Sequence, residues 1–158
     1  MILICDSSAL IALAICDKLD LLEKLFHKVA IPKAVFYEVT NSNKPEAEKL
    51  KLFLKDKICD IDLKSYILSD FTLQIGELEV MALYKNLNAD RLLIDDKKAK
   101  KVAIANGIKV IGSLGVLLSA KKINLINEIK TSIEMIKSSN IFIDDKTIKI
   151  VLELAGEI

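Results

Sequence analysis

The sequence predicts an α/β fold of three layers, in which a mostly parallel central sheet carries helices on both faces. Short apolar runs alternate with longer segments whose apolar residues recur at helical spacing. The first run, residues 1–6, leads directly into a helical pattern, as a central parallel strand does. The chain has 158 residues, 52% of them hydrophobic, which suits a single domain over 1–158.

The predicted elements follow one another in strand and helix order. After the first strand, strands are expected at 28–31, 57–61, 91–94 and 108–111. Helices are expected at 8–16, 18–26, 32–40, 45–55, 77–87, 97–106 and 114–122, with Pro32 and Pro45 opening two of them and Gly76 preceding another. A polar connector runs from 62 to about 74. Residues 123–139 and 144–156 also have helical spacing, which predicts a helical C-terminal extension over about 123–158.

Composition bears on the partners, the cysteine chemistry and the location of the protein. Lys and Arg number 23 against 22 Asp and Glu, so a formal charge of +1 gives no global basic field, and any nucleic-acid contact needs a local patch. Cys5, Cys16 and Cys59 lie in apolar stretches without metal-ligand spacing, which indicates buried free thiols in a reducing cytoplasm. No apolar segment approaches the ~18 residues of a membrane span, so we expect a cytoplasmic protein.

Acidic residues occur at four places that the predicted fold brings forward. Asp6 ends the first strand, Glu38 lies on a following helix, Glu77 lies at a helix start, and Asp95 and Asp96 end a later strand. Ends of parallel strands line the ligand crevice of such sheets. Oxygen ligands without His or thiolate favour Mg²⁺ or Mn²⁺ over zinc.

Five motifs in this order make the chain resemble a PIN domain, and more narrowly the branch related to VapC-type toxins. They are Asp6-Ser7-Ser8-Ala9-Leu10, Ile31-Pro32 with Glu38-Val39, Gly76-Glu77-Leu78-Glu79, Leu93-Ile94-Asp95-Asp96, and Val110-Ile111-Gly112-Ser113-Leu114. The resemblance implies a metal-dependent ribonuclease fold whose carboxylates converge at the strand ends.

By that resemblance Asp6 is the first acidic position, Glu38 the second, Glu77 the third, and Asp95 or Asp96 the fourth. Many PIN domains have Thr-x-Asp at the fourth position, whereas this chain has Ile94-Asp95-Asp96, so both Asp residues stay candidates. Relatives commonly form homodimers, and a toxin would have a separate antitoxin protein as partner.

Each candidate also has an ordinary structural interpretation. Asp6 could cap the first helix, Glu38 could be a solvated helix residue, and Glu77 could stabilise a helix start. Glu79 lies about 200° around the helix from Glu77, so the two should not face one centre. Ser8 and Ser113 are candidates for supporting hydroxyls or for helix-start residues.

A cluster of Lys residues follows the Asp pair: Lys97, Lys98, Lys100 and Lys101. It forms either a phosphate-binding patch for RNA or a solvated helix face. Aromatic residues make up only 5% of the chain, which argues against an extended base-stacking platform. His27 is the sole His and has no evident partner for base catalysis, so we interpret it as a surface or packing residue.

These observations and the resemblance together predict a divalent-metal-dependent endoribonuclease with Asp6, Glu77, Asp95 and Asp96 as metal ligands, and the resemblance also implies the toxin of a toxin-antitoxin pair. The alternative is a catalytically inactive PIN-like binding module that keeps its acids for folding. A receiver-type phosphoacceptor is a weaker third choice, because it needs an acidic pair after the first strand and a lone Asp after a middle one, nearly the reverse of this chain.

Overall fold

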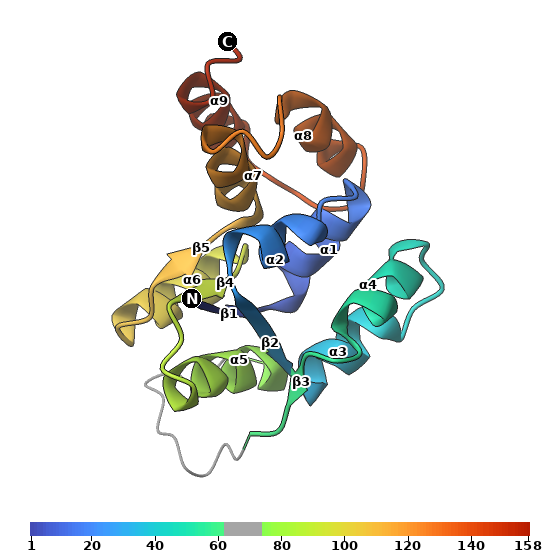
Figure 1. The fold of residues 1–158 in the computed structure, drawn as a ribbon, viewed down its shortest axis with the longest axis vertical. Helices are drawn as coiled ribbons and strands as arrows, with labels where there is room; N and C mark the ends of the chain where they lie inside the picture. Colours follow the sequence, from blue (N-terminus) through green and yellow to red (C-terminus); the bar gives the residue numbers. More distant parts are fainter. Residues whose placement is uncertain (62–73) are drawn as a thin grey trace.

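The computed structural model describes residues 1–61 and 74–158, so most of the connector predicted at 62–74 lies outside the described residues. Its strands form one parallel sheet in the order β3-β2-β1-β4-β5 (Figure 1). They are β1 Ile2–Cys5, β2 Lys28–Pro32, β3 Ile58–Cys59, β4 Arg91–Leu93 and β5 Val110–Ile111. The predicted fold class is confirmed.

Helices cover both faces of the sheet. They are α1 Ser7–Ile15, α2 Asp20–Leu25, α3 Lys33–Thr40, α4 Glu46–Leu54, α5 Ile75–Asn86, α6 Lys97–Ala105, α7 Ser113–Lys122, α8 Lys130–Lys137 and α9 Asp145–Leu154. Helix α5 packs across β1, β2 and β4, and α6 packs against β5. Helices α1, α2 and α7 lie together on the other side of the sheet, with α8 and α9 beyond them (Figure 1).

Strand β1 is the middle of the sheet and marks the point where the chain reverses direction. From β1 the chain proceeds to β2 and β3, and then returns through α5 to β4 on the other side of β1. The register pairs Cys5 of β1 with Leu93 of β4. A crevice opens at the carboxyl ends of strands at such a reversal, so residues that follow Cys5 and Leu93 occupy the usual ligand site of this architecture.

The core explains why β1 is so uniformly apolar. Leu3, Ile4 and Cys5 have no exposed surface, as expected of a strand covered by helices on both faces. Helix α1 is buried along most of its length for the same reason. Both elements on either side of Asp6 are therefore held in the interior, which restrains the backbone at that residue.

Two of the predicted helix boundaries were wrong. Gly76 does not precede α5 but lies in its first turn. The helix predicted at 123–139 is confined to Lys130–Lys137. Asn124 adopts a left-handed conformation with φ 60°, which ends α7, and the Leu125 N–H closes the turn on the Ala120 carbonyl at 2.9 Å.

The start of α8 depends on a residue far along the chain. The Glu157 carboxylate accepts hydrogen bonds from the backbone N–H groups of Ile129 at 2.8 Å and Lys130 at 2.9 Å, and it pairs with Lys121 Nζ at 2.7 Å. A carboxylate at the amino end of a helix satisfies N–H groups that have no partner within the helix. Glu157 thus joins α7 and α8 to the end of the chain.

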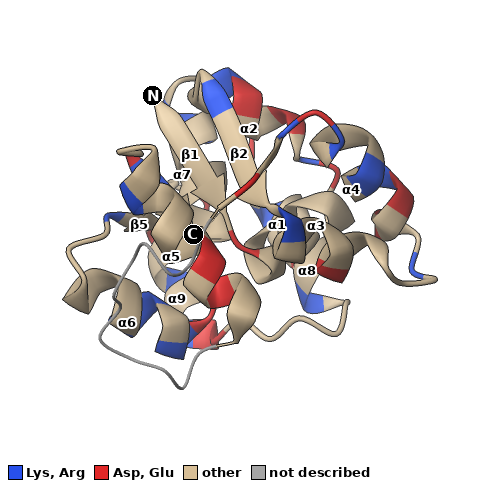
Figure 2. Cartoon of the chain, turned by 90° about the horizontal axis from the view of Figure 1, so that it is seen from below, with Lys and Arg blue, Asp and Glu red and all other residues tan. Residues whose placement is uncertain are grey.

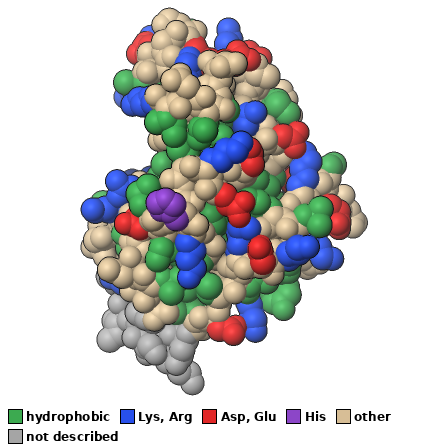
Figure 3. Space-filling model, viewed as in Figure 1, with side chains coloured by type: hydrophobic (Ala, Val, Ile, Leu, Met, Phe, Trp, Pro, Cys, Tyr) green, Lys and Arg blue, Asp and Glu red, His purple; other side chains and the backbone are tan. Residues whose placement is uncertain are grey.

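Smaller differences concern the edge strands, which are shorter than the predicted 57–61 and 108–111. Cys5 and Cys16 are buried free thiols as predicted, but Cys59 is only half-buried because β3 lies at the sheet edge. None of the helices in the described ranges is both long and apolar enough to cross a membrane. Positive and negative side chains are interspersed over the face in Figure 3, in keeping with the net charge of +1.

Replacing Glu157 by Ala should lower the free energy of unfolding by about 1–3 kcal/mol, because two backbone N–H groups and an ammonium lose a charged acceptor. Urea denaturation checks this. The matched control is Glu153→Ala, whose exposed carboxylate is 3.9 Å from Lys149 Nζ and which should change stability by less than about 0.5 kcal/mol. Equal effects of the two variants would contradict the role assigned to Glu157.

Candidate functional site

Asp6 is a buried acid at the carboxyl end of the central strand. Asp6 is only 5% exposed, and its backbone N–H donates to the Leu93 carbonyl of β4 at 2.8 Å. It stands at the amino end of α1 but makes no capping hydrogen bond with its side chain. Helix capping therefore does not explain why an acid occupies this position.

The environment of Asp6 disfavours its negative charge. Burial, the largest cause, and the charges of Glu77, Glu38 and Asp96 together raise its pKa from 3.8 to about 7, although the backbone N–H of Ser7 opposes the rise. Acids from three other segments of the chain therefore act on Asp6. We call Asp6, Glu38, Glu77 and Asp96 the carboxylate cluster.

Glu38 reaches the cluster from α3. The Ser7 hydroxyl donates to Glu38 Oε2 at 2.7 Å, which ties α3 to the start of α1. A methyl group added at Gly76 would lie 3.3 Å from the same oxygen. The glycine therefore lets the first turn of α5 approach Glu38 closely, and this approach places Glu77 beside the cluster.

Glu77 is held by its own helix in this structure. Its Oε2 accepts a hydrogen bond from the Gln74 backbone N–H at 3.0 Å, a capping interaction at the start of α5. Glu77, and not Glu79, is among the charges that raise the pKa of Asp6. This agrees with the expectation, from the angle between them on the helix, that Glu77 and Glu79 do not face one centre.

The structure separates Asp95 from Asp96. Both oxygens of Asp95 accept hydrogen bonds from Ser113, one from the backbone N–H and one from the hydroxyl, each at 2.7 Å. Asp95 therefore fastens the end of β4 to the start of α7. Asp96 Oδ1 accepts from the Ala99 N–H at 2.8 Å at the start of α6, and it is Asp96 whose charge acts on Asp6.

Backbone space at Gly112 supports the role of Asp95. A methyl group there would lie 2.9 Å from Asp95 Oδ1, closer than side-chain carbons approach such an oxygen. Because Asp95 is held by two hydrogen bonds, it has little freedom to move aside. The Gly112-Ser113 pair is thus shaped to receive the Asp95 carboxylate.

The two serines predicted as supporting hydroxyls behave differently. Ser113 is buried and bonded to Asp95, whereas the Ser8 Oγ is buried without a hydrogen bond to any residue in the described ranges. Ser7, which the sequence analysis did not select, is the hydroxyl bonded to the carboxylate cluster through Glu38. Its position directly after Asp6 was the available signal.

The four lysines at the start of α6 do not act as one patch. Lys97 Nζ pairs with Asp144 at 3.3 Å, so an acid before α9 balances its charge. Lys98 and Lys101 are exposed, and Lys100 is half-buried in a pocket that also contains Asp95. In Figure 2 the ribbon of α6, with its Lys positions in blue, lies beside the ribbon of α9, which carries Asp and Glu positions in red. The local positive field is weaker than the sequence alone indicates.

A divalent ion fits the donor set of the carboxylate cluster, which consists of oxygen ligands around a buried acid. Within 1–61 and 74–158, however, no three Asp, Glu, His or Cys side chains are grouped closely enough to hold an ion as they stand. Glu38, Glu77 and Asp96 are instead turned toward hydrogen-bond donors of the protein. Binding an ion would require them to exchange these donors for it.

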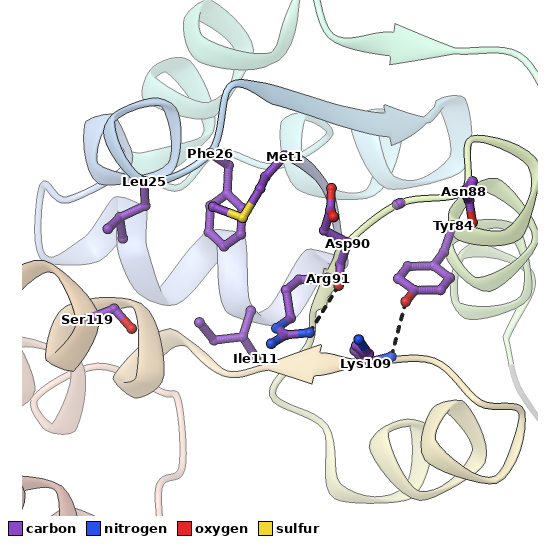
Figure 4. Close-up of a pocket in the computed structure, with 11 residues that line it drawn as sticks. Met1, Leu25, Phe26, Tyr84, Asn88, Asp90, Arg91, Lys109, Ile111 and Ser119 are labelled. Atoms are coloured by element: carbon purple, nitrogen blue, oxygen red, sulfur yellow. Dashed lines mark hydrogen bonds between the residues drawn. The ribbon is translucent and has the colours of Figure 1, made fainter.

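A separate pocket lies at the amino ends of the strands, opposite the carboxylate cluster. It measures about 670 Å³ and is lined at the amino ends of the strands by residues that include Met1, Phe26, Arg91 and Lys109 (Figure 4). Its one lining carboxylate, Asp90, accepts the Ile2 N–H at 2.6 Å. No member of the carboxylate cluster lines this pocket. His27 is exposed at this same end of the sheet, with its Nδ1 2.8 Å from the Met1 nitrogen, remote from the carboxylate cluster.

The Asp6 geometry predicts an unusual pH dependence for the metal-free protein. The folded pKa of Asp6, about 7, exceeds the unfolded value of 3.8, so the folded state retains a proton that the unfolded state has lost, and stability falls as pH rises from 3.8 to about 7. Asp6→Asn removes this effect and should stabilise the protein at pH 8 by up to about 4 kcal/mol, with a much smaller gain at pH 4.

Urea denaturation in EDTA at the two pH values measures this difference. Asp145→Asn, which replaces the carboxylate of a side chain that is 90% exposed, serves as the control and should change neither value appreciably. An Asp6→Asn protein no more stable than the wild type at pH 8 would show that the charge of Asp6 is already compensated.

Comparison with known proteins identifies the family of the chain. No curated protein matches the chain. The family model DUF3368, described as a PIN domain, matches residues 2–157. The match takes in all five parallel strands and every member of the carboxylate cluster. The chain therefore belongs to the PIN-domain family.

Proposed function

We propose that the chain is a divalent-metal-dependent endoribonuclease that hydrolyses RNA phosphodiesters. PIN domains are generally nucleases, and the nuclease-like fold is shared by this chain. The observation that carries the proposal is Asp6, a buried acid whose charge is disfavoured by burial and by three neighbouring carboxylates. Such a group destabilises the fold at neutral pH unless a cation or a proton accompanies it.

Asp6, Glu77 and Asp96 are the residues best placed to hold Mg²⁺ or Mn²⁺, with Glu38 beside them. A bound divalent ion supplies polarisation of the phosphodiester and a more acidic water. The elements of the fold position these acids: Asp6 directly follows β1, Glu77 lies in the first turn of α5, and Asp96 directly precedes α6. Asp95 acts on the site indirectly by holding α7 through Ser113.

A second candidate function is a non-catalytic PIN-like interaction module. The hydrogen bonds of Glu38, Glu77 and Asp96 to protein donors favour it, because they give these acids structural roles without an ion. Calorimetric titration with Mn²⁺ distinguishes the two. Binding that is lost in Asp6→Asn supports the nuclease, and absence of binding supports the module.

A role as the toxin of a toxin-antitoxin pair, with an antitoxin protein as partner, is a further part of the proposal, as is a homodimer. Both derive from the resemblance noted in the sequence. Sedimentation equilibrium at micromolar concentrations would report monomer mass if the homodimer is wrong. Growth arrest on expression, relieved by Asp6→Asn, is the expected behaviour of a toxin.

Cleavage of a mixed RNA pool should require Mg²⁺ or Mn²⁺ and stop in EDTA. Asp6→Asn and Asp96→Asn should each reduce cleavage at least about 100-fold, because each removes a ligand charge from the cluster. Asp145→Asn changes an exposed residue that is not part of the carboxylate cluster, and it should cleave like the wild type. Cleavage that persists in EDTA would rule out the metal-dependent mechanism.

The two adjacent Asp residues should respond differently. Asp96→Asn should weaken Mn²⁺ binding at least about tenfold, whereas Asp95→Asn should leave it within about threefold. Asp95→Asn should instead lower the free energy of unfolding by about 1–3 kcal/mol, since Ser113 loses an ionised acceptor. Calorimetry and urea denaturation provide both readouts. Reversed results would make Asp95 the metal ligand.

A further inference from the structure

Phe142 has an exposed ring in an unusual place. Among the large apolar side chains of the described ranges it is the most exposed, at 85%. A single exposed apolar residue is common on protein surfaces and needs no explanation by itself. The setting of Phe142 is what distinguishes it, because the ring borders a pocket shared with the acid at the end of β4.

This pocket measures about 210 Å³ and lies where the starts of α6, α7 and α9 meet. We call it the α6–α9 pocket. The lining residues that matter here are Asp95, Lys97, Lys100, Ser113, Phe142 and Asp144. Asp95 is followed directly by Asp96 of the carboxylate cluster, so the pocket adjoins the proposed site of hydrolysis.

The segment that carries Phe142 is fixed at both ends. On one side the Ile141 N–H donates to Ser139 Oγ at 3.1 Å. On the other, Asp144 accepts from the Thr147 N–H at 2.9 Å and hydroxyl at 2.7 Å, and pairs with Lys97. The backbone is thus anchored while the ring is left uncovered. A phenyl ring has few rotatable bonds, so ordering it on binding costs little entropy.

Lys100 supplies a positive charge to the same pocket. It is half-buried, and it forms no ion pair with any residue that the structure describes. A methyl group at Gly112 would lie 3.6 Å from Lys100 Nζ and 2.9 Å from Asp95 Oδ1, so the ammonium lies on the same side of Gly112 as the Asp95 carboxylate. Lys97, in contrast, is already paired with Asp144. Lys100 is therefore the lysine of this pocket with a charge available to a ligand.

We infer that the α6–α9 pocket is a nucleotide subsite in which Phe142 stacks on an unpaired RNA base and Lys100 contacts a neighbouring phosphate. An aromatic face and an ammonium are the two groups that single-strand binding sites combine. A base within a duplex offers no free face to such a ring, so the substrate is single-stranded or looped RNA. The inference rests on the proposed ribonuclease function.

Binding to a non-cleaving protein tests the subsite apart from catalysis. The parent is Asp6→Asn, and the probe is a short single-stranded RNA containing 2-aminopurine, with the same sequence in a duplex as comparison. Adding Phe142→Ala should weaken single-strand binding at least about fivefold and abolish the fluorescence quenching that stacking causes. Phe142→Tyr should preserve both, and Lys100→Gln should weaken binding and reduce its salt dependence.

Two matched variants separate stacking from general apolar contact. Phe142→Leu keeps an apolar side chain without a ring and should behave like Phe142→Ala. Leu154→Ala removes an apolar side chain that is 61% exposed on α9 outside the pocket, and should bind like the parent. The temperature of thermal unfolding should be unchanged in both variants, because Phe142 and Leu154 are largely exposed.

Failure of the subsite and failure of the proposed function differ in outcome. If the wild type cleaves RNA and Phe142→Ala does so with an unchanged KM, the subsite is wrong and the ribonuclease stands. If Phe142→Leu binds RNA as well as the parent, stacking is overturned and a general apolar contact accounts for the binding. If the wild type neither binds nor cleaves RNA, the subsite and the proposed function are both overturned.

Discussion

The buried carboxylate of Asp6 is the constraint on which the rest of the site depends. Its backbone is held on both sides, by the central strand β1 and by α1, and its N–H is bonded to β4. The side chain therefore cannot turn to solvent, and its pKa of about 7 records the cost of charging it there. The charges of Glu77, Glu38 and Asp96 add to that cost, so ionised Asp6 opposes folding.

Each of the other three acids of the cluster accepts a hydrogen bond from a protein donor. Glu38 accepts from a hydroxyl, and Glu77 and Asp96 accept from backbone N–H groups. A hydrogen bond to a charged acceptor contributes roughly 1.5–3 kcal/mol net, less than a divalent cation can supply among several carboxylates. Glu77 and Asp96 thus cap helices and Glu38 accepts the Ser7 hydroxyl, and holding an ion would require all three to exchange these donors for it. Asp95 differs, because two hydrogen bonds from Ser113 occupy both of its oxygens.

Sequence patterns predicted the sheet and the strand ends that bear Asp6 and the Asp95-Asp96 pair, because apolar runs make strand ends visible, whereas Glu38 and Glu77 lie on helices and were selected by their order in the motifs. They could not distinguish Asp95 from Asp96, since that depends on Ser113 at the end of a neighbouring strand. The helix predicted at 123–139 was wrong for a similar reason. Apolar spacing continues through 123–129, but the left-handed Asn124 and the distant Glu157 decide where one helix ends and the next begins. Contacts between remote residues, which periodicity does not encode, account for these differences.

Charge pairing also limits what the lysines of α6 can do for a nucleic acid. A run of four lysines in a helix start suggests a strong positive patch, but the fold brings Asp144 to Lys97, and Asp95 and Asp96 lie at the same end of the helix. With a net charge of +1, little long-range attraction remains to draw in a polyanion. Under the proposed function, affinity for RNA would then come from short-range contacts that do not depend on net charge. The base proposed to stack on Phe142 would supply such a contact, since its energy arises from the ring face.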